Sequence, residues 1–124
     1  ANTTLCRLNV RGNLVADVGA EALGATLARN SSLVELTLRS NRIADRGAAA
    51  IAEGLGANRA LQTLSLKQNK VGKEGGLELA RGVRANDALA ALDCGENALG
   101  SEAEDALRKA WITRRRQPAS LRLG

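Results

Sequence analysis

The stretch LVELTLRSNRI, residues 33–43, decides the fold because close copies of it recur at a fixed spacing. The copies are LCRLNVRGNLV at residues 5–15, LQTLSLKQNKV at 61–71 and LAALDCGENAL at 89–99. Each copy has apolar residues at its first, fourth, sixth and eleventh places and Asn at its ninth, and successive copies start 28 residues apart, at Leu5, Leu33, Leu61 and Leu89. A period of this size is typical of a solenoid, in which each repeat buries its apolar face against the next.

The fourth and sixth places of each copy predict a short strand, because side chains two residues apart point to the same side of a strand. We therefore expect Leu36 and Leu38, with their equivalents in the other repeats, to point into the core. The asparagine follows where the chain leaves the strand and its backbone groups lose their partners in the sheet. Since a side-chain amide both donates and accepts, we expect main-chain bonds from the four asparagines Asn13, Asn41, Asn69 and Asn97.

The second half of each repeat predicts a helix, because its apolar residues, such as Ile51 and Leu55, are three or four positions apart. We expect N-caps at Asp17 and Asp45. Three asparagines are expected to end helices in a left-handed conformation: Asn30, Asn58 and Asn86. A glycine recurs in the first helical turn, where a side chain would collide with the neighbouring repeat: Gly19, Gly47 and Gly75.

Stacking these units predicts a curved α/β solenoid. Parallel strands pair about 4.8 Å apart whereas packed helices need about 8–10 Å, so the stack bends with its strands on the inner side. We expect a horseshoe arc of about four and a half repeats, with parallel strands on the concave face and helices on the convex face. Residues 1–124 are expected to form a single domain and to be a fragment of a longer array, because no polar cap precedes the first strand and a partial fifth strand begins near Leu121.

The motif LxxLxLxxNxL and the helical repeat resemble the leucine-rich repeats of the ribonuclease-inhibitor-like class, and the resemblance covers essentially the whole chain. It implies the arc described above but is poorly specific for function. Similar arrays serve in ribonuclease inhibitor, in the Ran GTPase-activating protein, in NOD-like immune receptors and in scaffold proteins. Asn at every ninth place is more similar to the receptor and GTPase-activating arrays than to ribonuclease inhibitor, in which Asn and Cys alternate.

The composition argues against an enzyme. The chain has no His, which removes the commonest general base and most zinc sites, and it has no GxxxxGK[ST] phosphate loop. Cys6 and Cys94 lie three repeats apart, about 14 Å by strand spacing alone, too far for a disulfide. We interpret Cys94, at an inward strand place, as a small buried hydrophobe. The acidic residues 102, 104 and 105 fall in the first turn of the last helix, where its dipole favours negative charge, so we expect no metal and no cofactor.

Membrane insertion and secretion are not indicated. No stretch approaches the roughly 20 apolar residues of a membrane span, and the first residues lack the basic and apolar regions that are typical of a signal peptide. Two isolated cysteines favour a reducing compartment, so we expect a cytoplasmic protein.

The outward strand places build the concave face without serving the core, so they are the candidate partner-binding residues. They are Arg7, Asn9, Arg11, Glu35, Thr37, Arg39, Thr63, Ser65, Lys67 and Asp93. One column of this face is basic, because Arg11, Arg39 and Lys67 occupy the same place in successive repeats. The column is explained either by solvation alone or by a partner with an acidic surface. Nucleic acid is disfavoured because the face has no aromatic side chain for base stacking.

We therefore expect a protein-interaction module of a larger intracellular receptor or scaffold that binds a protein partner through the concave face. The alternative is a fragment of a Ran-type GTPase-activating protein that contacts a small GTPase, and a third possibility is a structural spacer without a ligand. Apolar ends make end-to-end self-association a further expectation.

Overall fold

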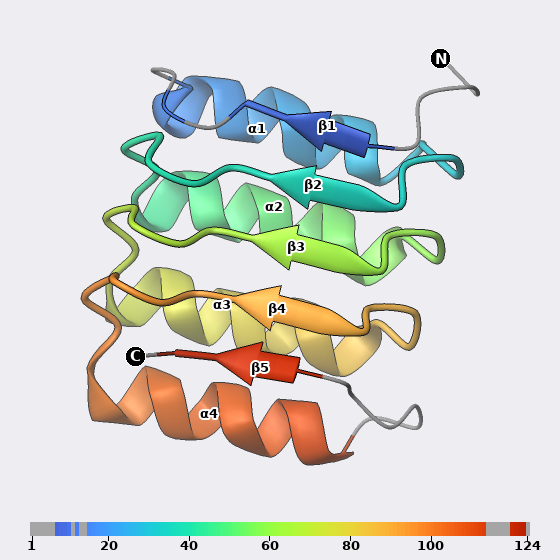
Figure 1. The fold of residues 1–124 in the computed structure, drawn as a ribbon. Helices are drawn as coiled ribbons and strands as arrows, with labels where there is room; N and C mark the ends of the chain where they lie inside the picture. The colour runs from blue at the N-terminus through green and yellow to red at the C-terminus, as the bar shows by residue number, and fades with distance from the viewer. Residues whose placement is uncertain (1–6, 11, 13–14, 114–119, 124) are drawn as a thin grey trace.

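In the computed structural model, which describes residues 7–10, 12, 15–113 and 120–123, strands and helices alternate along the chain. The strands are β1 (Arg7–Asn9), β2 (Glu35–Thr37), β3 (Thr63–Ser65), β4 (Ala91–Asp93) and β5 (Ser120–Arg122). The helices are α1 (Ala16–Leu27), α2 (Asp45–Ala57), α3 (Lys73–Ala85) and α4 (Gly100–Thr113). Figure 1 shows the strands side by side in one layer and the helices in a second layer behind them. The predicted α/β solenoid is confirmed.

The five strands form one parallel sheet in the order of the sequence. The pairing keeps equivalent places of successive repeats level, with Leu8 opposite Leu36, then Leu64, Leu92 and Leu121. The first three steps advance by the predicted period, and the last is one residue longer. The inward places of the fifth strand therefore lie where the sequence predicts them.

The core lies between the two layers and is built from the predicted places. Leu36, Leu64 and Leu92 of the sheet are at most 1% exposed, and Ile51 of α2 is fully buried. Trp111 is also buried in this core. Burying an aliphatic side chain of this size contributes roughly 1.5–3 kcal/mol to stability. The continuous aliphatic core therefore holds one repeat to the next.

The strand-end asparagines bond to main chain as predicted, and they do so between repeats. The Asn69 carboxamide oxygen accepts from the backbone N–H groups of Asn41 (2.9 Å) and Ile43 (3.0 Å) of the preceding repeat. Its amide nitrogen donates to the carbonyls of Leu38 and Leu66, both at 2.9 Å. Asn41 and Asn97 make equivalent bonds, whereas Asn13 lies outside the described residues. The asparagine therefore satisfies backbone groups in two repeats at once.

The prediction that the helix-end asparagines adopt a left-handed conformation is wrong. Asn58 and Asn86 have φ of −90° and −100° with extended ψ. They form a second ladder instead, in which the Asn86 amide donates to the carbonyls of Leu55 (2.8 Å) and Asn58 (2.7 Å). The Asn86 oxygen accepts from the backbone N–H of Leu89 at 2.7 Å. Asn58 and Asn86 therefore end α2 and α3 in an extended conformation, and their carboxamides, which both donate and accept, bond across repeats.

The prediction of N-caps at Asp17 and Asp45 is wrong for their own helices, since neither α1 nor α2 has a side-chain cap. The carboxylates serve the next repeat instead. Asp17 Oδ1 accepts from Ala44 N (2.8 Å) and Gly47 N (3.0 Å) at the start of α2, and Asp45 Oδ1 accepts from the backbone N–H before α3 at 2.6 Å. A negative charge at a helix N-terminus is favourable whichever repeat supplies it.

The first-turn glycines are explained by the same contacts. A Cβ at Gly47 would lie 2.6 Å from Asp17 Oδ1, and one at Gly75 would lie 2.8 Å from Asp45 Oδ1. The predicted collision with a neighbouring repeat is therefore confirmed at these two positions. At Gly19 the prediction is wrong, because the atom that a Cβ would meet belongs to Val15 of the same repeat.

Candidate functional site

The predicted binding residues lie together on the exposed face of the sheet, the side opposite the helices (Figure 1). We call this surface the sheet face. It holds every predicted binding residue except Arg11, which lies outside the described residues. In β2, β3 and β4 the central leucine is buried whereas its two neighbours are partly exposed, so the outward places are available for contact with a partner.

The outward side chains form columns because the strands pair in register. One column runs from Asn9 through Thr37 and Ser65 to Asp93 and ends at Arg122 of β5. Sequence reasoning did not include Arg122 among the binding residues. The signal for it was present, because Leu121 and Leu123 mark the inward places and leave Arg122 pointing outward.

Three further residues on this surface were missed by the sequence analysis. Ser40, Gln68 and Glu96 occupy the place before each asparagine and have φ of 61°, 62° and 54°. A side chain in this left-handed region costs roughly 1–2 kcal/mol, so the position is set by the turn and not by local preference. The signal was Gly12, which occupies the same place in the first repeat with φ of 74°.

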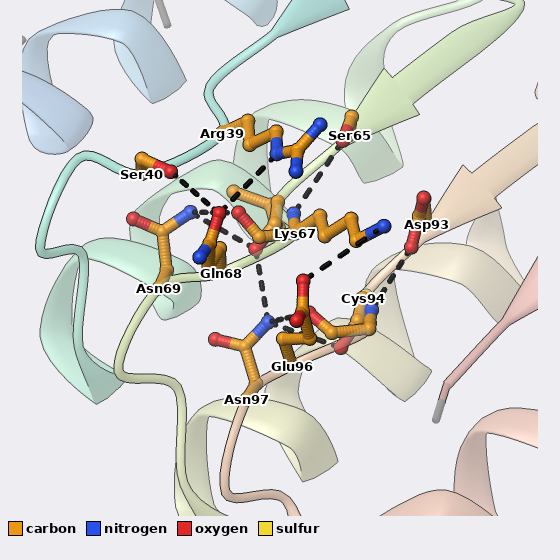
Figure 2. Close-up of polar contacts among 12 residues, drawn as sticks. Arg39, Ser40, Ser65, Lys67, Gln68, Asn69, Asp93, Cys94, Glu96 and Asn97 are labelled. Atoms are coloured by element: carbon orange, nitrogen blue, oxygen red, sulfur yellow. Dashed lines mark hydrogen bonds and ion pairs between the residues drawn. The ribbon is translucent and has the colours of Figure 1, made fainter. Parts of the chain in front are cut away.

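These turn residues bond the basic column, as Figure 2 shows. Gln68 Oε1 accepts from Arg39 Nε (3.3 Å) and from the Ser40 hydroxyl (3.0 Å). Lys67 Nζ lies 3.8 Å from Glu96 Oε2 in a half-exposed ion pair. The basic column is therefore not a row of free cations, since its second described member has a carboxylate beside it. An exposed pair of this kind contributes at most about 1 kcal/mol to stability.

The sheet face also has a shallow hollow of about 260 Å³ over β3, β4 and β5. Its polar lining comes from Thr63, Ser65, Asp93 and Arg122. Asp93 Oδ1 accepts from the backbone N–H of Gly95 at 2.9 Å, which fixes the direction of its carboxylate. The hollow is therefore lined by one anionic group, one cationic group and two hydroxyls.

Cys94 has no free thiolate for chemistry. The residue is 1% exposed, and burial, together with the negative charge of Asp93, raises the pKa of its thiol to about 12. A thiol with so high a pKa is a poor nucleophile, so the interpretation of Cys94 as a buried hydrophobe is confirmed. Cys6 lies outside the described residues.

The acidic residues of α4 bind cations of the protein itself. Glu102 Oε1 lies 3.1 Å from Lys73 Nζ of α3, and this carboxylate raises the pKa of the lysine. Arg108 pairs with Asp105 at 3.1 Å and with Glu104 at 3.5 Å. Within the described part of the chain, no three Cys, Asp or Glu side chains are grouped as metal ligands would be. The same part of the chain contains no helix with the length and apolar character needed to cross a bilayer.

Two solved structures share this fold. Actin-binding site 2 of leiomodin-1 superposes with a TM-score of 0.84 at 21% identity, over 98% of this chain and 71% of that one. The C-terminal domain of Caenorhabditis elegans tropomodulin superposes with a TM-score of 0.84 at 16% identity, over 99% of this chain and 75% of that one. At these identities the likeness establishes the fold alone. No curated protein matches the sequence.

A family model described as leucine-rich repeat matches residues 1–24, 29–52 and 57–80. The three matches begin at the same interval as the repeats, and together they cover more than half of the chain. The parallel sheet, the helix layer and the strand-end asparagine ladder fit this assignment. The chain therefore belongs to the leucine-rich repeat family.

Proposed function

We propose that this chain is a non-catalytic protein-binding module whose sheet face, together with the turns that follow the strands, contacts a protein partner. The observation that carries the proposal is the register of the outward side chains, which places polar groups in columns over five strands while the core uses only the inward places. A large interface needs a wide, ordered surface, and a sheet fixed by backbone bonds supplies it without ordering on binding.

The charges of this face favour a partner of mixed polarity rather than one that is simply acidic. Arg7, Arg39, Lys67 and Arg122 are set against Glu35, Asp93 and Glu96. β1, β2 and the turn after β2 carry Arg7 and Arg39 against one carboxylate, Glu35, which is level with Arg7. The carboxylates of Asp93 and Glu96 both come from the fourth repeat, and that of Glu96 lies beside Lys67, so the most cationic part of the face lies toward β1 and β2. We therefore expect an acidic segment of the partner to lie over Arg7 and Arg39, and a basic one near Asp93.

Charge reversal on the sheet face tests the proposal. The Arg39→Glu, Lys67→Glu double variant is expected to weaken partner binding at least 10-fold, because like charges facing each other across an interface oppose association. The matched control is the Arg29→Glu, Arg59→Glu double variant, which changes two exposed residues beyond the ends of α1 and α2. Equal affinities of the two double variants in isothermal titration calorimetry would reject the sheet face as the binding site.

We infer an intracellular receptor or scaffold as the parent of this module, and monomeric actin is the first partner to test because actin-binding site 2 of leiomodin-1 has the same fold. The alternative, a fragment of a Ran-type GTPase activator, makes a different prediction. Added to Ran and other small GTPases, the chain would then accelerate GTP hydrolysis. Acceleration that is lost in the Arg39→Glu, Lys67→Glu variant would favour the alternative.

A further inference from the structure

A groove on the helix layer is independent of the sheet face. It lies between α3 and α4 and has a volume of about 310 Å³. Its floor is apolar and is formed by Leu77, Ala80, Ala106 and Ala110. The lining residues of both helices follow the three- and four-residue spacing of a single helix face, so the groove runs along the two helices for about two turns, or about 10 Å.

The groove is open because the last helix lacks a glycine that the preceding one has. A Cβ at Gly82 of α3 would lie 2.5 Å from the carbonyl oxygen of Ala52, so α2 and α3 touch through their backbones. Ala110 occupies the equivalent place in α4 and presents a methyl group there. The hollow between α2 and α3 is correspondingly smaller, about 250 Å³, and the one between α1 and α2 is about 170 Å³.

The rim of this groove is cationic. Arg81, Arg84 and Lys109 line it together with the floor residues and Thr113, and no carboxylate does. Arg81 pairs with a glutamate of its own helix, whereas neither Arg84 nor Lys109 forms an ion pair within the described residues. The hollow between α2 and α3 differs, because two glutamates line it.

We propose that the groove between α3 and α4 binds an acidic amphipathic helix of a protein partner. Two or three apolar side chains of that helix lie on the alanine floor against Leu77, and its carboxylates lie beside Arg84 and Lys109. Arg84 and Lys109, which form no ion pair within the described residues, favour this occupant over a basic or neutral helix, because such a helix would bring no negative charge to them. The site is small for a protein interface, so it acts as a second contact beside the sheet face.

The probe for this site is a synthetic 16-residue helical peptide with leucines on one face and glutamates on both sides of that face. The matched control is the same peptide with lysines in place of the glutamates. Binding to the full chain is measured by isothermal titration calorimetry, and the site is located by NMR shift changes in α3 and α4. The glutamate peptide is expected to bind at least 10-fold more tightly than the lysine peptide. The Arg84→Glu, Lys109→Glu double variant is expected to reverse that order, because its rim carries carboxylates in place of these two cations. Both peptides keep the same apolar face, so only the charges differ between them.

The Ala110→Leu variant, which fills the groove, is expected to lose both peptides, and the Arg29→Glu, Arg59→Glu variant is expected to bind like the wild type. Circular dichroism establishes that each variant is folded. Equal affinity of the two peptides, an unchanged order in the double variant, or shift changes confined to the sheet face would overturn the proposal. A dimer in analytical ultracentrifugation that Ala110→Leu abolishes would assign the groove to a second copy of the chain and would also overturn it.

Discussion

Replacing Asn69 by alanine tests the physical basis of the whole array. Its carboxamide oxygen is the acceptor for two backbone N–H groups, at Asn41 (2.9 Å) and Ile43 (3.0 Å), and both of these residues are fully buried. Alanine leaves both donors without their partner, and each unsatisfied buried group costs about 1–3 kcal/mol. The carbonyl of Leu66 loses less, because it also accepts from the Asn97 amide at 2.9 Å. We expect the free energy of unfolding to fall by about 3 kcal/mol.

This loss is large beside the total stability of about 5–15 kcal/mol that is usual for a domain. In urea denaturation followed by circular dichroism, with a slope near 2 kcal/mol per molar, the midpoint is expected to fall by about 1.5 M. The matched control is Gln68→Ala, which removes two bonds from an exposed side chain of the same turn and is expected to cost less than about 0.5 kcal/mol.

The strand-end asparagines differ in the number of their bonds, so their substitutions are expected to differ in the loss of stability. The Asn97 oxygen accepts from one backbone N–H, that of Val71 at 3.0 Å, so Asn97→Ala is expected to cost about half as much as Asn69→Ala. A loss below about 1 kcal/mol at Asn69, or equal losses at Asn69 and Gln68, would refute the reasoning that buried backbone groups depend on these amides.

The remaining predictions concern single contacts. Gly82→Ala is expected to cost about 2–3 kcal/mol, because its methyl group would meet a backbone oxygen at 2.5 Å, whereas Gly56→Ala, with 3.6 Å to the nearest atom, is expected to be neutral or slightly stabilising by thermal unfolding. Asp45→Ala is expected to cost about 1 kcal/mol in the same assay, since it removes the cap of α3, and an unchanged midpoint would contradict that role. In a Cys6→Ser background, Cys94 is expected to react with a thiol reagent at pH 8 about 1,000-fold more slowly in the native chain than in urea, because its pKa is raised from 9.0 to about 12. Since the folded pKa is the higher one, this thiol leaves stability unchanged below pH 9 and lowers it as the pH rises from 9 to 12, which denaturation midpoints across that range would measure.

The fold was predictable because every repeat has the same pattern of apolar residues. Alternation at Leu36 and Leu38 selects a strand, the change to helical spacing selects the second layer, and the fixed period makes the strands parallel and in register. The strand-end asparagine was predictable for the same reason, since a turn that leaves a sheet always exposes backbone groups. The positions of the sheet-face residues followed from the alternation of side chains along a strand.

The contacts between repeats were not predictable in the same way. Asp17 and Asn86 looked like local helix caps, yet both bond to backbone in a neighbouring repeat. The ion pair of Lys67 with Glu96 and the groove created by Ala110 also depend on how far one repeat is displaced from the next. That displacement results from packing of the whole two-layer core, so a pattern within one repeat does not encode it. The sequence by itself therefore determined the repeat, its elements and the direction of its side chains. Only the tertiary structure decided which polar groups meet, because hydrogen bonds and ion pairs depend on distances of a few ångströms that stacking sets.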